Sequence, residues 1–344
     1  MAKKFRPRSL LLGVLSVIAF VLLLPWASGR LIVFAPGATP EIQQAVRNAG
    51  DLDQYLREVE ARASERDGLA IRTDQAKAIR WAHAPGQVTE LAIVYIHGFS
   101  ASRLELEPGV SKLAQSLGAN LYATRLRAHG MESGDAFAAV KAQDWVSDVR
   151  EAVEIGRRIG QRLIVMGTST GAPLAIFAAQ ENPDLLGVII MSPNFGIQRR
   201  GGALLAGPLG PMMARLALGS HREWEAQNAE HARRWTTRYP SVGVVAMMDW
   251  VRWLETQDLR EIQVPVFTLY SKRDRVVRVD LIEERAAEFT AAGSKVTEWA
   301  RANRHELASA TFNPELIEEL VGLWRAWIAE RLASATGRGD ESEK

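Results

Sequence analysis

The stretch Leu163-Ile-Val-Met-Gly167-Thr-Ser169-Thr-Gly171-Ala-Pro173-Leu-Ala-Ile176 decides how the rest of the chain is interpreted. Its first four residues form a short apolar run, which is typical of a strand buried on both faces. An apolar, alanine-rich segment with helical spacing follows Gly171. Pro173 suits the first turn of that helix, where a missing N–H leaves no partner unsatisfied. Ser169 is therefore predicted to lie at a tight turn between a strand and a helix.

The residues around Ser169 have the pattern Gly-x-Ser-x-Gly. Small residues at 167 and 171 allow the strand and the helix to approach closely, and the serine takes a strained backbone conformation. The helix N-terminus directs free N–H groups and a partial positive charge toward whatever the serine attacks. This is the pattern of a nucleophile elbow. The pentapeptide alone occurs by chance in about one chain in ten of this length. A nucleophilic serine also requires a general base and an acidic residue further along the chain.

Composition excludes several classes of function. The chain has 344 residues, 47% hydrophobic and 24% charged, with a net charge of +2. That is enough for one large α/β domain with an insertion, and the balanced charge gives no sign of nucleic-acid binding. Without cysteine there are no disulfides, cysteine nucleophiles or thiolate metal sites. The histidines are scattered, and neither a P-loop nor a Gly-rich dinucleotide motif occurs. We expect no metal, no cofactor and no nucleic-acid partner.

The N-terminus has a composition typical of a membrane anchor or a signal peptide. Residues 1–8 are basic, and no charge follows from Ser9 to Gly29. About 20 apolar residues can span a bilayer as a helix, and the basic flank then places the rest of the chain outside the cytoplasm. The densest part, Leu10–Leu24, also fits a signal-peptide core, with small residues after it for cleavage. Residues 1–30 are expected to be a transmembrane anchor or a cleaved signal peptide, and in both cases the domain is extracytoplasmic.

Strand–helix alternation defines the remaining organisation. Residues 31–75 are expected to be a linker and then an amphipathic helix packed at the domain edge. Residues 76–193 and 261–332 alternate strands and helices, which predicts an α/β core with a mostly parallel sheet and helices on both faces. Residues 194–260 break the alternation and are rich in Met and Trp, which suits a helical cap over an apolar ligand. The polar tail, 333–344, is expected to be flexible.

Two later strand ends carry the partners that a nucleophilic serine needs. Asp274 follows the predicted strand Val264–Tyr270, and His305 follows the predicted strand Lys295–Ala300. In an open parallel sheet these ends face one crevice. We expect His305 to act as the general base on Ser169 and Asp274 to orient the imidazole. Asp280 and Glu306 fit this third role less well, because the first is near a helix start and the second is adjacent to the histidine.

A third strand end supplies the groups that would bind a developing oxyanion. The predicted strand Leu91–Ile96 runs into His97-Gly98-Phe99. The backbone N–H groups of Phe99 and Thr170 are the expected oxyanion donors. His129 also follows a predicted strand, but it precedes the serine in the chain and is interpreted as structural.

With these motifs in place, the chain resembles the α/β-hydrolase superfamily, in the branch of monoacylglycerol lipases, small carboxylesterases and serine aminopeptidase-like hydrolases. The resemblance covers about Ile79 to Leu332. It rests on the elbow, on Asp274 and His305 at their strand ends, and on the motifs His97-Gly98-Phe99, Arg125-x-x-x-His129-Gly130 and Asp144-Trp145-x-x-Asp148. Many relatives carry His and Met around the serine and a further Gly, where this chain has Thr168, Thr170 and Ala172.

The resemblance implies a serine hydrolase that cleaves carboxylic esters with an apolar acyl group, of monoacylglycerol-like or small-ester type, through an acyl-enzyme. A serine at 169 argues against dehalogenase chemistry, which needs a carboxylate nucleophile. A peptidase or amidase of the same fold is the alternative, and Glu223, Glu225 and Glu230 in the cap leave open a site for a free amine. A catalytically silent ligand-binding protein is the third hypothesis, because a fold alone does not determine a function.

Overall fold

The computed structural model describes residues 39–199 and 201–341. Seven strands form one sheet in the order β1-β3-β2-β4-β5-β8-β9. Only β1 runs antiparallel to its neighbour, so the predicted mostly parallel sheet is confirmed. The strands are β1 (Ala78–Arg80), β2 (Thr89–Ile96), β3 (Asn120–Ala123), β4 (Gly160–Thr168), β5 (Gly187–Met191), β8 (Val266–Tyr270) and β9 (Lys295–Glu298).

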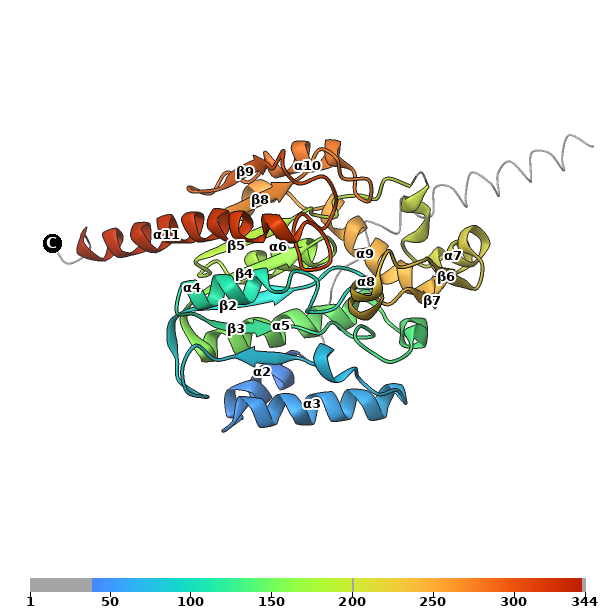
Figure 1. Ribbon diagram of the computed structural model, residues 1–344, viewed down its shortest axis with the longest axis horizontal. Helices are drawn as coiled ribbons and strands as arrows, with labels where there is room; N and C mark the ends of the chain where they lie inside the picture. Colours follow the sequence, from blue (N-terminus) through green and yellow to red (C-terminus); the bar gives the residue numbers. More distant parts are fainter. Residues whose placement is uncertain (1–38, 200, 342–344) are drawn as a thin grey trace, which may run out of the picture.

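Helices cover both faces of the sheet (Figure 1). On one face lie α4 (Gly109–Ser116) and α11 (Ile317–Glu341), and on the other lie α5 (Ala142–Ile159) and α6 (Gly171–Glu181). The remaining helices are α2 (Thr39–Asn48), α3 (Leu52–Asp67), α7 (Gly210–Leu218), α8 (Ala229–Arg234), α9 (Val244–Glu255) and α10 (Val279–Ala286). The last helix continues to Glu341, past its expected end at Leu332, and no proline interrupts it.

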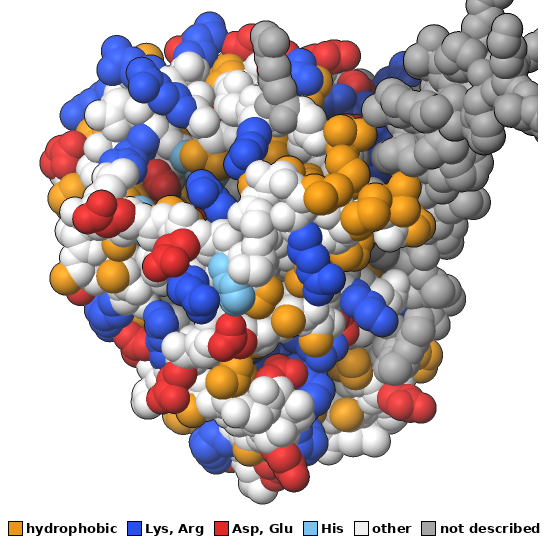
Figure 2. All heavy atoms as spheres, turned by 90° about the vertical axis from the view of Figure 1, so that its right-hand side faces the viewer, with side chains coloured by type: hydrophobic (Ala, Val, Ile, Leu, Met, Phe, Trp, Pro, Cys, Tyr) orange, Lys and Arg blue, Asp and Glu red, His pale blue; other side chains and the backbone are white. Residues whose placement is uncertain are grey.

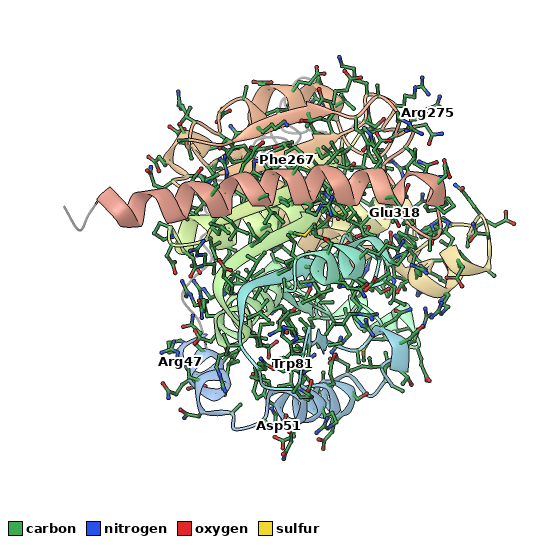
Figure 3. All side chains as sticks on the ribbon, turned by 60° about the vertical axis from the view of Figure 1, so that its left-hand side comes forward. Arg47, Asp51, Trp81, Phe267, Arg275 and Glu318 are labelled. Carbon is green, nitrogen blue, oxygen red and sulfur yellow. The ribbon has the colours of Figure 1, made fainter. Side chains whose placement is uncertain are left out.

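The central strands are buried on both sides, as their continuous apolar runs predict. In β2, Ala92 and Val94 belong to the core under α5 and α6, whereas Ile93 and Tyr95 belong to the core under α11. This alternation is the two-residue period of a strand. On β8, Phe267 points toward α11 (Figure 3), where it stacks on Trp327 with ring centroids 5.7 Å apart.

The segment expected to be a linker contains a helix, α2. Its Val46 is fully buried, and Arg47 forms an ion pair of 2.9 Å with Glu154 on α5. Arg158 donates to the backbone carbonyls of Val46 and Ala49 at the end of α2. Packing on α5 therefore stabilises this helix.

The predicted amphipathic helix, α3, is present at the edge of the sheet. Its buried face includes Leu52 and Leu56, and Asp51 caps its N-terminus by accepting from the Gln54 N–H at 3.0 Å. Arg47 and Asp51 mark this edge in Figure 3. Both N-terminal helices thus belong to the folded domain.

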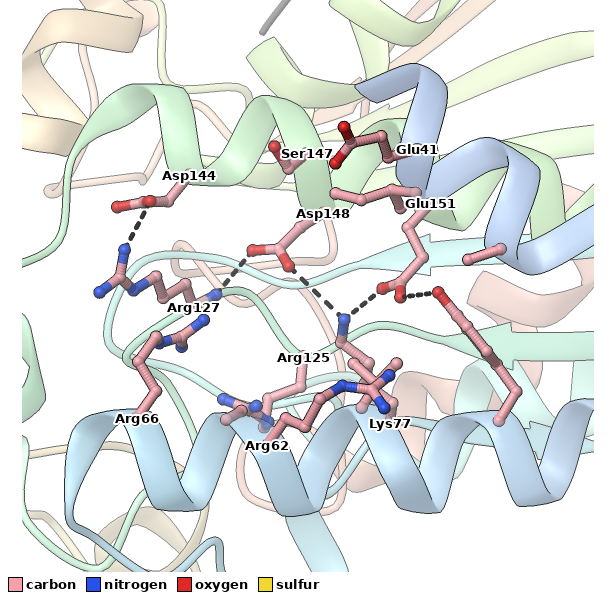
Figure 4. A pocket seen from close by; sticks show the side chains of 15 residues that line it. Glu41, Arg62, Arg66, Lys77, Arg125, Arg127, Asp144, Ser147, Asp148 and Glu151 are labelled. Atoms are coloured by element: carbon pink, nitrogen blue, oxygen red, sulfur yellow. Dashed lines mark hydrogen bonds and ion pairs between the residues drawn. The ribbon is translucent and has the colours of Figure 1, made fainter. Parts of the chain in front are cut away.

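A buried network of charges joins this edge to α5, around a cavity of about 620 Å³ (Figure 4). Lys77 is buried, and its Nζ forms an ion pair with Glu151 and lies 3.5 Å from Oδ1 of Asp148. Tyr55 of α3 donates to Glu151 at 2.9 Å. The second oxygen of Asp148 accepts the Arg127 N–H at 2.7 Å. Every charge in this chain of contacts has a partner of opposite sign or a hydrogen bond.

The segment 194–260, expected to be a helical cap, has two parts. The first holds α7, α8 and a two-stranded sheet of β6 (His221–Glu223) and β7 (Arg238–Pro240), and it projects beyond the main sheet (Figure 1). The second is α9, whose Trp250 and Trp253 pack edge-on against Phe177 of α6. This helix is therefore part of the core.

The predicted apolar helix at the N-terminus lies outside the described residues. Within 39–199 and 201–341, no helix combines the length and the apolar character needed to cross a bilayer.

We predict that Lys77→Met destabilises the protein by about 3–5 kcal/mol, because it leaves Glu151 and Asp148 buried without their cation. Urea unfolding followed by circular dichroism measures this. Arg62→Gln is the control: Arg62 is exposed, lies 3.9 Å from Glu58, and its loss is expected to cost less than about 1 kcal/mol. Equal effects of the two substitutions would contradict a stabilising role for the buried network.

Candidate active site

Ser169 occupies the turn between β4 and α6, with a backbone φ of 52°. Close packing at this turn explains both glycines. A Cβ on Gly167 would lie 2.2 Å from the carbonyl oxygen of Gly171, and a Cβ on Gly171 would lie 2.2 Å from that of Ile96. The Ser169 N–H donates to Met191 O at 2.9 Å. The strained serine is thus held by β2 and β5 on either side of its own strand.

Asp274 and His305 come together from loops after β8 and β9. The Nδ1 of His305 lies 2.6 Å from Oδ2 of Asp274, and both side chains are buried. The other oxygen of Asp274 accepts the N–H groups of Val276 and Val277. With Nδ1–H donated to the carboxylate, Nε2 is the ring nitrogen left to accept a proton.

The environment of His305 favours its protonated form. Burial lowers the pKa of this imidazole, but the Asp274 carboxylate, with smaller effects of Glu306 and Glu105, raises it, and the net pKa lies above its ordinary value. The loop that carries it is anchored at two points: Ser192 Oγ donates to His305 O, and Ser271 Oγ donates to Ala302 O, each at 2.6 Å. The imidazole is therefore both oriented and made more basic.

Ser169 and His305 line one cavity of about 440 Å³ beneath the cap. Its wall is largely apolar. The apolar lining comes from the core, from both parts of segment 194–260 and from the loop after Asp274, and consists of Phe99, Ile197, Leu205, Leu218, Trp224, Trp235, Tyr239, Val244, Met247 and Val276. Of the Met and Trp residues in segment 194–260, Trp224, Trp235 and Met247 line the cavity, whereas Trp250 and Trp253 pack in the core.

Two backbone N–H groups beside Ser169 remain available. Neither the N–H of Phe99 nor that of Thr170 donates to any group in the part of the chain that the structure describes. Phe99 lines the cavity, and Thr170 is the residue before α6. Their positions suit donors to an oxyanion formed at Ser169.

Two other buried histidines hold the neighbouring turns in neutral form. His97 Nε2 accepts the Leu126 N–H at 3.1 Å, and His129 Nε2 accepts the Ser100 N–H at 3.0 Å. Burial lowers the pKa of His97 to about 4 and that of His129 well below its usual range. The structural interpretation of His129 agrees with these contacts, because Nε2 fixes the loop after Phe99 and Nδ1 lies 3.0 Å from the carbonyl oxygen of Arg127.

Glu105 is a site residue that the sequence analysis missed. It is 2% exposed and lines the same cavity. Its Oε2 accepts the Gly98 N–H at 2.8 Å and the Tyr95 hydroxyl at 2.9 Å. A Cβ on Gly98 would lie 2.8 Å from Glu105 Oε1 and 3.2 Å from Ser169 Cβ. Burial raises the pKa of Glu105 to about 7. No motif marks a glutamate eight residues after His97, so only the fold reveals it.

The other carboxylates considered from the sequence lie elsewhere. Asp280 pairs with Arg278 at the start of α10, and Glu306 pairs with Arg304 at 2.9 Å. Glu223, Glu225 and Glu230 of the cap are not among the residues that line the cavity with Ser169. They therefore offer no amine-binding group there.

Comparison with known proteins agrees with this fold. A family model described as "Serine aminopeptidase, S33" matches residues 87–310. A thermostable monoacylglycerol lipase from Bacillus sp. (strain H-257) is 26% identical over 99 residues, which are 29% of this chain and 39% of that relative. The match thus spans well under half the length of this lipase.

Solved structures share the architecture at low identity. One, reported for the metagenome-derived lipolytic enzymes LipS and LipT, has a TM-score of 0.59 at 18% identity, covering 76% of this chain and 99% of that one. A soluble variant of monoglyceride lipase from Saccharomyces cerevisiae has a TM-score of 0.58 at 13% identity, covering 74% and 91%. On the family match, with the fold in agreement, this chain belongs to the S33 family of α/β-hydrolases, in the branch that includes monoacylglycerol lipases and esterases.

Proposed function

We propose that this protein is a serine hydrolase that cleaves carboxylic esters with an apolar acyl group. One observation carries the proposal. Ser169 lies on a strained turn in the same cavity as His305, whose other ring nitrogen is 2.6 Å from Asp274. A protein that only bound its ligand would have no need of this arrangement.

In the proposed reaction, Ser169 Oγ attacks the ester carbonyl while His305 Nε2 accepts its proton. Asp274 stabilises the resulting imidazolium and keeps the tautomer that leaves Nε2 free. The N–H groups of Phe99 and Thr170 bind the carbonyl oxygen as it becomes negative, an interaction worth about 10²–10³ in rate for one donor. His305 then gives its proton to the leaving alcohol, and an acyl-enzyme remains on Ser169.

Water completes the cycle by the same route. His305 takes a proton from water, which attacks the acyl carbonyl, and Ser169 is released when the proton returns to its oxygen. The closely packed elbow fixes the serine before substrate arrives, so little reorganisation accompanies the reaction.

The cavity lining supports an apolar acyl group. Aromatic and methionine side chains provide a wall that adapts to ligand shape. Among relatives, the Bacillus protein is named a monoacylglycerol lipase, and we propose an ester of that kind or a smaller one as substrate. The absence of a carboxylate from the cap wall of the cavity makes a free-amine substrate, and hence aminopeptidase activity, the weaker alternative.

We further propose that the domain acts outside the cytoplasm. The support is the sequence of residues 1–30 alone, a basic start followed by an uncharged apolar run. Fractionation of cells that produce the full chain, followed by protease treatment of intact spheroplasts, tests this. Protection of the domain from protease would contradict it.

We predict that Ser169→Ala lowers kcat by about 10⁴–10⁶ without unfolding the protein, because it removes the nucleophile and a single oxygen atom. The measurement is hydrolysis of p-nitrophenyl esters of graded chain length, with labelling by a fluorophosphonate probe. Wild-type protein should label and the variant should not. A folded wild type that neither labels nor turns over would favour the silent binding protein.

We predict that kcat/KM rises with pH along an acidic limb whose midpoint lies above 6.5, because only neutral His305 accepts a proton and its pKa is raised. Glu105→Gln should move this limb to lower pH. The Glu105 charge contributes to the raised His305 pKa, and its removal makes the imidazolium less stable, while the amide oxygen still accepts the Gly98 N–H.

Exposed Glu284 on α10 provides the control for this pH profile. Glu284→Gln removes the same charge outside the cavity and should leave the limb in place. If the acidic limb of the Glu105→Gln variant coincides with that of the wild type, or lies at higher pH, Glu105 is not a positioning residue for His305.

A further inference from the structure

Three arginines from separate segments line the cavity of Ser169 and His305. Arg199 lies in the loop after β5, Arg222 on β6 of the cap, and Arg275 directly after Asp274. All three are exposed, so their guanidinium groups are at the rim rather than in the wall. Arg222 also lowers the pKa of buried Tyr239 on the neighbouring strand β7, although burial dominates and raises it overall to about 12. Arg222 and Tyr239 are partners in the register of β6 and β7, and both line the cavity.

In the part of the chain that the structure describes, no acidic side chain pairs with these guanidinium groups. Arg222 donates to the backbone carbonyl of the adjacent Glu223 at 3.5 Å. Other surface arginines differ: Arg233 pairs with Asp74 and Arg278 with Asp280. The three rim arginines thus retain their charge for another partner.

Acidic groups around the cavity do not cancel this charge. Glu306 already pairs with Arg304, and Glu105 is 2% exposed, so its carboxylate lies in the wall rather than at the mouth. The net field at the cavity mouth is positive, and a cleft lined by charges of one sign concentrates ligands of the opposite sign.

A second hollow extends the positive region. It has a volume of about 680 Å³, shares Arg275 and His305 with the first, and adds Arg273. Figure 2 shows this end of the molecule, where blue side chains lie on several sides of a hollow with orange side chains beside it. Arg275 lies at the end of the molecule opposite the labelled Arg47 and Asp51 (Figure 3).

The cavity is therefore apolar inside and cationic at its mouth. A ligand that matches both parts has an apolar chain and an anionic group. Phosphate and carboxylate are the anions that guanidinium binds best, by paired N–H donors.

We propose that the preferred substrate is an amphiphilic ester with a phosphate or carboxylate group, which Arg199, Arg222 and Arg275 bind at the rim while the ester reaches Ser169. This inference rests on the proposed esterase function and names its substrate class. Recognition of an anion is the opposite of the free-amine recognition that an aminopeptidase needs.

Two matched pairs of substrates test the proposal. 1-Decanoylglycerol and 1-decanoylglycerol 3-phosphate differ only by a phosphate on the alcohol. 4-Nitrophenyl octanoate and mono-4-nitrophenyl octanedioate differ by a carboxylate on the acyl chain. We expect at least one anionic member to have the higher kcat/KM, through a lower KM. The substrate pair that shows the preference identifies whether the anion is on the alcohol or on the acyl chain. The preference should weaken as salt rises from 50 to 500 mM, because exposed charges are screened.

Arginine variants then assign the preference to the rim. Arg199→Gln, Arg222→Gln and Arg275→Gln should each lower the ratio of kcat/KM for the anionic over the neutral ester by about 2- to 5-fold, and the triple variant by about tenfold or more. Arg325→Gln on α11 is the matched control, since Arg325 is exposed and lines neither hollow. It should leave the ratio unchanged.

The outcomes separate this inference from the proposed function. Ser169-dependent cleavage of the neutral esters with no anionic preference, or a preference that the triple variant retains, overturns the inference alone. Failure to cleave any of the four esters overturns the proposed function as well.

Discussion

The close approach of β4, β2 and α6 at the serine turn is the constraint on which the site depends. Gly167 and Gly171 have no space for a Cβ, since one would lie 2.2 Å from a backbone carbonyl oxygen in each case. Ser169 between them is held at a φ of 52°, a conformation that non-glycine residues adopt only when the surroundings enforce it. The dense packing of two buried cores around the sheet supplies that enforcement. Substitution of either glycine would move the strand and the helix apart and take the serine out of position.

The electrostatic environment gives side chains of the same type different protonation states and different roles. His97, His129 and His305 are all buried, yet only His305 faces a carboxylate through one ring nitrogen. Burial, with a smaller effect of nearby Arg125, lowers the pKa of the other two, which stay neutral and hold backbone N–H groups. Glu105 shows the reverse effect, because burial raises its pKa to about 7 beside the same imidazole. The chemistry of each group follows from its neighbours rather than from its residue type.

Local patterns predicted the buried strands β2 and β4 from their apolar runs. The strands predicted before Asp274 and His305 correspond to β8 and β9, although β9 is largely exposed. Prediction failed where stability comes from distant partners. Helix α2 depends on Val46, Arg47 and Arg158 contacts with α5, and α9 lies in the core because its tryptophans reach Phe177. The segments of β6 and β7 also lack a clear alternation of apolar and polar residues.

The sequence by itself determined the type of fold, the elbow and the chain order of the candidate triad, because these depend on short-range patterns and on the rule that parallel strands end at one edge. Only the tertiary structure decided which further groups meet there. Glu105 approaches Ser169 through the packing of a loop after β2, and Arg199, Arg222 and Arg275 converge from three separate segments. Such convergence has no signature in sequence spacing, since the positions are brought together by the packing of the cap on the core rather than by any local pattern.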